Sequence, residues 1–171
     1  MIAESIAFIV SNLPAFLFVA ALLIAAFGRT PRWSTPERFV SWILLLPIGV
    51  TGLWAAAFHL LAPSVAAHLI GWETSPFQFE VGMADLAIGT TAFASFWCSL
   101  PFKAAAVWAA SIFLLGDAVG HVHQMLAARN FAPGNAGVPF FMDIICPALS
   151  IMLLVAAWRY HRAGQSLRRS V

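Results

Sequence analysis

Six side chains that can bind a metal ion or a proton lie in or beside the apolar runs of this sequence. They are His59, Glu80, Asp85, Asp117, His121 and Asp143. Carboxylates and neutral imidazoles are the usual ligands of Zn, Fe, Mn and Cu, and helical bundles assemble such ligands from facing helices. These residue types therefore predict a buried site for a transition-metal ion, whose identity the ligand set does not specify.

The spacing of the helical residues indicates which ligands act together. Asp117 and His121 are four positions apart, so they share one face of a helix and would supply two ligands. Glu80 or Asp143 would supply a third from another helix. A remaining carboxylate would act as general base for a metal-bound water.

Small residues beside these acids predict close helix packing. Gly82 and Gly89 lie on the same helical face as Asp85, and Gly116 and Gly120 form a small-x-x-x-small pair. We expect a neighbouring helix to approach closely at both places.

Five apolar runs must position these side chains. They cover residues 5–27, 39–61, 79–100, 104–128 and 140–160. Each is long enough to cross a hydrocarbon layer about 30 Å thick, and none shows the alternation of a barrel strand. Because backbone groups in lipid must be paired internally, the runs predict an all-α integral membrane bundle of five transmembrane helices. Residues 1–171 would form one domain.

The composition supports a membrane protein. The chain is 61% hydrophobic and 9% charged, with a mean hydropathy of +0.87. A soluble domain is about one quarter charged. So few polar residues exclude a soluble enzyme and a nucleic-acid-binding protein, and make the lipid bilayer the first partner.

The basic residues predict the orientation. Eight of the nine Lys and Arg residues fall on one side of the runs: Arg29, Arg32, Arg38, Lys103, Arg159, Arg162, Arg168 and Arg169. Arg129 lies on the other side. The positive-inside rule places the N-terminus outside, the C-terminus in the cytoplasm and the protein in the plasma membrane, with the six candidate ligands within about 10 Å of the outer boundary.

The cytoplasmic connections are expected to be simple. Residues 28–37 form a short connector in which Glu37 is solvated, and Pro101, Phe102 and Lys103 form a minimal turn. The outer connections 62–78 and 130–139 are richer in Pro, Gly, Asn and aromatic residues, which is typical of ordered turns and interfacial segments.

Several interpretations of the same residues remain open. Asp117 and His121 could form a metal-free polar network with protonated acids, or part of a path for protons or solutes. Haem is a weaker candidate cofactor: His59 with His121 or His123 could ligate it, but acids crowd these positions and no C-x-x-C-H motif is present.

Three segments resemble an uncharacterised family of small bacterial and archaeal membrane proteins. They are S-P-F-Q-F-E-V-G-M-A-D-L-A-I-G at 75–89, G-D-A-V-G-H at 116–121 and F-M-D at 141–143. This resemblance implies a small multi-pass protein and carries no activity. The D-x-x-x-H element also resembles one part of the copper-binding subunit of membrane methane and ammonia monooxygenases, but the second His of that family is not found downstream.

The sequence thus predicts a metal-binding membrane protein with a site near the extracytoplasmic face. It would be an enzyme acting on a small or lipidic ligand from the outer leaflet, or a metal-binding subunit of a larger complex or oligomer. A proton or solute transporter and a structural assembly subunit are the alternatives.

Overall fold

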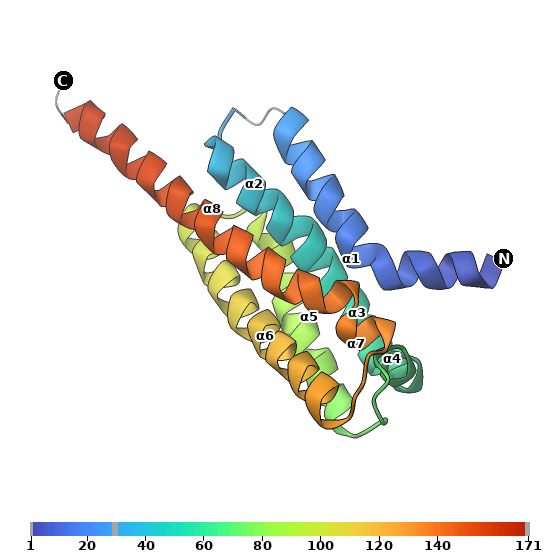
Figure 1. The fold of residues 1–171 in the computed structure, drawn as a ribbon. Coiled ribbons are helices and arrows are strands. Elements are labelled where there is room, and N and C mark those ends of the chain that lie inside the picture. Colours follow the sequence, from blue (N-terminus) through green and yellow to red (C-terminus); the bar gives the residue numbers. More distant parts are fainter. Residues whose placement is uncertain (1, 29–30, 170–171) are drawn as a thin grey trace.

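The computed structural model describes residues 2–28 and 31–169, and over these ranges the chain is all-α, with no strand. The helices are α1 (Ile2–Phe27), α2 (Thr35–Ile43), the π-helix η1 (Leu44–Val50), α3 (Thr51–Leu61), α4 (Pro63–Ile70), α5 (Phe77–Ser95), α6 (Leu100–Ala127), α7 (Pro133–Ala136) and α8 (Val138–Arg169). The long segments form one bundle (Figure 1). Arg29 and the side chains of Arg168 and Arg169, which enter the orientation argument, lie outside the described residues.

The five expected helices correspond to α1, the continuous α2–η1–α3 segment, α5, α6 and α8. Three stretches are long and apolar enough to cross a membrane: Thr35–Leu61, Leu100–Ala127 and Pro133–Ser166. The apolar part of α1, Ser11–Phe27, is shorter. The all-α fold is therefore confirmed, while the five crossings and their orientation remain predictions.

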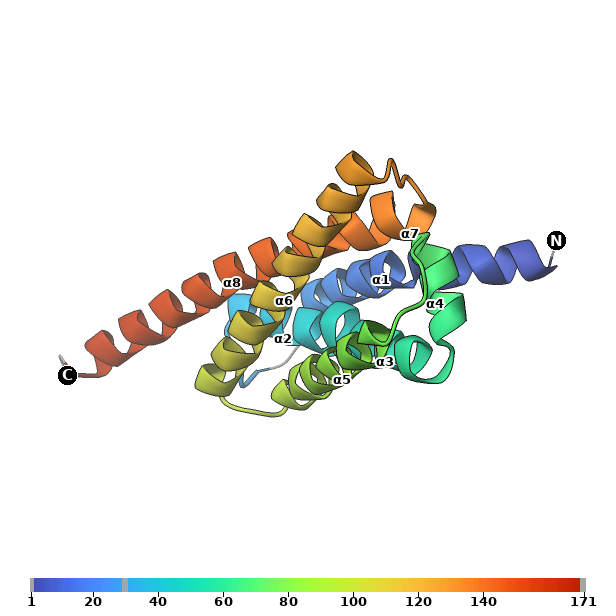
Figure 2. The same cartoon turned by 90° about the horizontal axis from the view of Figure 1, so that it is seen from below.

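Two short helices mark one end of the bundle. α4 and α7 contact each other there, next to the end of α3 and the starts of α5 and α8 (Figure 2). We call this the α7 end. The opposite end, with the starts of α2 and α6, is called the Glu37 end. Beyond it the C-terminal turns of α8 project from the bundle (Figure 1).

The α2–η1–α3 segment shows how the sequence shapes one long helix. Ser34 caps its start, with its Oγ accepting a hydrogen bond from the Glu37 amide at 3.4 Å, and Pro36 occupies the first turn. Pro47 lies inside η1. Proline has no N–H to donate, so an α-helical hydrogen bond is lost there, and the chain continues with a π-helical register.

Glycines bring α5 against this helix. A Cβ atom on Gly89 would lie 2.7 Å from the backbone nitrogen of Leu53, and one on Gly49 would lie 2.9 Å from the backbone nitrogen of Phe93. Gly82 is similarly close to the His59 side chain. The close packing expected for the Gly82–Gly89 face is therefore confirmed, because only glycine leaves room for the two backbones.

The second glycine pair behaves differently. A Cβ atom on Gly116 or Gly120 would meet no atom within 4 Å. The expectation that a neighbouring helix approaches α6 at this pair was wrong for this chain. The buried face of α6 instead carries Ala106, Val107 and Ala110.

An apolar core fills the middle of the bundle. Its buried residues include Val40, Ile43 and Leu44 of α2 and η1, together with Val107 of α6 and Cys146 of α8. Two groups of buried or half-buried ionisable side chains lie on either side of this core, one toward each end of the bundle.

Candidate functional site

The first polar group lies toward the α7 end and combines carboxylates from three helices. Asp85 of α5 is 8% exposed, Asp117 of α6 is half-buried, and Asp143 lies in the second turn of α8. The three carboxylates come from helices that pack against one another, α5 against α6 and α6 against α8. Among the described residues, no lysine or arginine forms an ion pair with them.

His121 is the imidazole of this group. It is 8% exposed, and its Nε2 lies 3.6 Å from Oδ2 of Asp143. Phe140 and Trp72 pack against its ring, with centroid distances of 6.4 and 6.0 Å. The sequence-based expectation that this face of α6 points into the bundle agrees with the structure. We call Asp85, Asp117, His121 and Asp143 the Asp/His cluster.

Asn135 of α7 determines which nitrogen of His121 carries the hydrogen. Its Nδ2 donates to the backbone oxygens of His121 at 3.3 Å and Asn130 at 2.9 Å, so the amide orientation is fixed. Its Oδ1 accepts from Trp72 Nε1 at 3.0 Å and lies 2.8 Å from His121 Nδ1. Since Oδ1 can only accept, Nδ1 is the donor, and Nε2 is the nitrogen directed at Asp143.

The loops at the α7 end hold Asn135 in place. Asn130 Nδ2 donates to the backbone oxygens of Ile70 at 2.9 Å and Gly71 at 3.1 Å, and its Oδ1 accepts from the Ala132 amide. Gly71 ends α4 with a φ of +74°, a left-handed conformation that favours glycine. Asn135 is fully buried as a result. The sequence predicted ordered turns here but not this buried asparagine.

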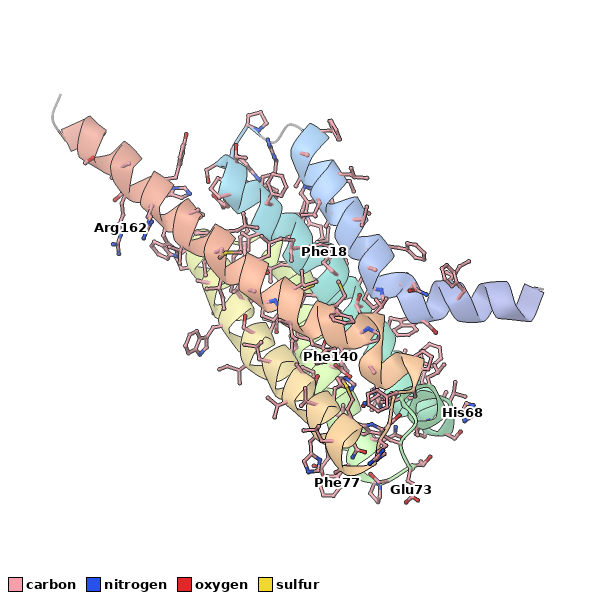
Figure 3. The ribbon with its side chains drawn as sticks, viewed as in Figure 1. Phe18, His68, Glu73, Phe77, Phe140 and Arg162 are labelled. Carbon is pink, nitrogen blue, oxygen red and sulfur yellow. The ribbon has the colours of Figure 1, made fainter. Side chains whose placement is uncertain are left out.

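Two of the predicted ligands lie apart from the cluster. Glu80 is exposed in the first turn of α5. His59 lies at the end of α3 against Gly82, and its Nδ1 is buried without a hydrogen-bond partner among the described residues. His68, which projects from the α7 end with Glu73 and Phe77 (Figure 3), and His123 are exposed.

The geometry does not supply a ready metal shell. Within residues 2–28 and 31–169, no three or more His, Cys, Asp and Glu side chains are grouped closely enough to hold a metal ion. Within the Asp/His cluster, the structure brings His121 Nε2 to 3.6 Å from Asp143 Oδ2.

An apolar groove of about 350 Å³ borders the cluster on the outer surface of α6 and α8. It is lined by Leu115, Ala118, Val119, Val122, Phe140 and Ile144. Phe140 belongs to both features, because it lines the groove and its ring contacts the His121 ring.

The second polar group lies at the Glu37 end and corrects two expectations. Glu37 was expected to be solvated and Lys103 to lie in a turn, but both are buried, with side chains 7% and 0% exposed. Lys103 lies in the first turns of α6, because the chain turns earlier, at 96–99, and Pro101 starts the helix. Its Nζ is 3.0 Å from Glu37 Oε1.

His161 of α8 completes this group. Its Nε2 is 2.9 Å from Glu37 Oε2, and its side chain is 43% exposed. Lys103 Nζ also lies 4.2 Å from the centroid of the Trp33 ring, which Arg32 contacts as well. We call Glu37, Lys103 and His161 the Glu/Lys/His cluster. The S-x-x-E pattern of a capping box at Ser34 was a signal that Glu37 belongs to a helix start.

Comparison with known proteins identifies the family but not an activity. Residues 11–163 match the model of DUF6790, a family of unknown function, and the chain therefore belongs to that family. No curated protein and no solved structure matches the chain. The resemblance to an uncharacterised family is confirmed, while its bacterial and archaeal origin remains a prediction.

Proposed function

We propose that this member of the DUF6790 family is a multi-pass protein of the plasma membrane that binds and releases protons at its Asp/His cluster and carries them across the membrane. The observation that carries this proposal is that three packed helices bring three carboxylates and one imidazole toward the inside of the bundle, without a lysine or arginine partner among the described residues.

Electrostatics explains why such a cluster holds protons. An ionised side chain at the centre of a bilayer costs about 2.5 kcal/mol or more on insertion scales. Neighbouring carboxylates raise that cost further, because their charges repel. Bound protons are the simplest way to remove these charges.

The His121–Asp143 pair has the geometry of a proton carrier. Nδ1 of His121 already donates to Asn135, so Nε2 carries a lone pair when the imidazole is neutral. A favourable Nε2 to Oδ2 contact then requires one proton, held either by the imidazole or by the carboxyl group. Proton exchange at this pair needs no change in the Asn135 contact.

The proposed orientation places the α7 end outside and the Glu37 end in the cytoplasm. Arg32 and Arg38 lie at the Glu37 end, and Arg162 lies on the projecting turns of α8 (Figure 3). Arg159 lies three residues before Arg162 on the same helix. Arg129 lies at the α7 end. This asymmetry supports five crossings with the N-terminus outside.

A transition-metal ion is the second candidate occupant. Metal-binding histidines usually donate their second ring N–H to an oxygen, as His121 Nδ1 does to Asn135, which leaves Nε2 free for an ion shared with Asp143 and Asp117. Haem is less suited, because the expected second ligands do not accompany His121: His59 lies apart from the Asp/His cluster, and His123 is exposed.

Proton flux into liposomes tests the proposal. We expect the purified protein to carry protons across the membrane, and Asp117→Asn or His121→Gln to lower the rate severalfold, because each removes a proton acceptor from the cluster. Glu80→Gln is the matched control, since it removes an exposed carboxylate from outside the cluster.

Two outcomes would contradict the proposal. In the first, liposomes with the wild-type protein show no more proton flux than empty liposomes. In the second, Glu80→Gln lowers the proton flux as much as Asp117→Asn. Elemental analysis of the same samples tests the metal candidate, which predicts about one bound ion per chain that Asp117→Asn removes.

A further inference from the structure

We infer that the Glu/Lys/His cluster is a second proton-exchange site, which opens to water at the membrane face opposite the Asp/His cluster. This inference rests on the proposed function. With this second site, the protein has one proton site near each face of the membrane.

Exposure shows where protons enter the second site. The side chains of Lys103 and Glu37 are 0% and 7% exposed, whereas that of His161 is 43% exposed. His161 contacts Glu37 at 2.9 Å, so the imidazole lies between water and the buried carboxylate. Water therefore reaches this cluster mainly at His161.

Charge balance leaves His161 free to exchange its proton. Lys103 alone neutralises Glu37, with Nζ 3.0 Å from Oε1. His161 contacts the other oxygen, Oε2. The imidazole can thus gain or lose a proton while the Lys103–Glu37 pair stays intact. The added positive charge lies on a partly exposed ring, beside water and Glu37 Oε2, and not in the protein interior.

Other titratable or charged groups surround this site. Tyr160 and Arg162 neighbour His161 on α8, and Arg38 follows Glu37 on α2. Arg32 contacts the same Trp33 ring as Lys103, and Cys98 lies in the turn before α6. All of them are retained in the experiment below, so any change in pH dependence reports on His161.

The two clusters are built on the same faces of the same two helices. On α6, Lys103 and His121 are eighteen positions apart, and on α8, Asp143 and His161 are also eighteen positions apart. Eighteen residues make five complete turns of an α-helix and rise about 27 Å. This distance is close to the roughly 30 Å thickness of the hydrocarbon layer.

The region between the clusters is closed. Val40, Ile43, Leu44 and Val107 are almost completely buried there. Ser150 lies between Asp143 and His161 on α8. It is fully buried, and its Oγ has no hydrogen-bond partner among the described residues. Because apolar side chains separate the two sites, protons cross only when the protein changes conformation, as in a carrier and not in an open channel.

The experiment measures proton flux in liposomes in which the protein has one orientation and the pH of each face is set separately. For the wild type, we expect the flux to depend on the pH at both faces. His161→Gln should lower the flux about tenfold and remove the pH dependence at the Glu37 face only. His123→Gln is the matched control, because His123 is exposed and lies outside both clusters.

The result distinguishes this inference from the proposed function. If His161→Gln lowers only thermal stability while flux and both pH dependences persist, the inference is overturned and the Asp/His cluster remains the proton site. If the wild type carries no protons, the proposed function itself fails. Nitrogen NMR of His161 in the wild type provides a measurement without a variant: its ring signals should follow the pH of the Glu37 face, and signals that ignore this pH would overturn the inference.

Discussion

Replacing Asn135 by Ala tests how the α7 end organises the Asp/His cluster. The side chain makes four hydrogen bonds, which involve Trp72 Nε1, His121 Nδ1 and the backbone oxygens of His121 and Asn130. Trp72 is 41% exposed and can bond to water instead, but Asn135 is fully buried, so its other partners lose their bonds inside the protein. At roughly 1 kcal/mol for each buried bond, we expect a loss of about 2–4 kcal/mol in the free energy of unfolding.

The assay is reversible denaturant unfolding of the purified protein in one detergent, followed by far-UV circular dichroism. Asn12→Ala is the matched control, because Asn12 donates one hydrogen bond to the Phe8 carbonyl of its own helix and is only half-buried. It should cost less than about 1 kcal/mol. An Asn135→Ala protein as stable as the Asn12→Ala protein would refute the reasoning. Nitrogen NMR should also show that His121 loses its fixed Nδ1–H tautomer in Asn135→Ala.

Two further predictions concern packing and topology. Gly89→Ala should destabilise the protein by about 1–3 kcal/mol, because its Cβ would lie 2.7 Å from a backbone nitrogen of α3, whereas Gly116→Ala should cost nothing measurable in the same unfolding assay; equal effects would contradict the packing. Cys introduced at the exposed position Glu73 should react with a membrane-impermeant thiol reagent in intact cells, and Cys at the exposed position Thr35 should stay protected; the reverse pattern would invert the proposed orientation.

The sequence predicts the helices well because the hydrocarbon layer constrains them strongly. Each apolar run had to be long and helical, and α1, α5, α6, α8 and the α2–η1–α3 segment follow those runs. The ends were harder to place. The turn between α5 and α6 lies at 96–99 rather than at Lys103, because apolar residues continue through it and proline favours the first turn of a helix as readily as a loop.

The spacing of residues in the sequence predicted part of the Asp/His cluster, but it did not predict that Asn135 hydrogen-bonds to His121. The four-residue spacing of Asp117 and His121 is a local property of α6, so it could be read directly. The approach of Asp85 and Asp143 depends on how three helices pack, and periodicity within a helix does not contain that information. Asn135 was missed because an asparagine in a loop is usually solvated.

The Glu/Lys/His cluster shows what kind of signal connects distant polar residues in a membrane bundle. Glu37 and Lys103 were assigned to loops because charged residues at the ends of apolar runs usually face water or headgroups. Yet Lys103 and His121, like Asp143 and His161, stand five full turns apart on one helix, so each pair must share a face wherever the helix packs. If a helix packs so that one residue of such a pair points into the bundle, the other residue of the pair points into the bundle as well. The burial of His121 was therefore a reason to expect Lys103 inside the bundle, and a buried lysine requires an acid, which α2 supplies through Glu37.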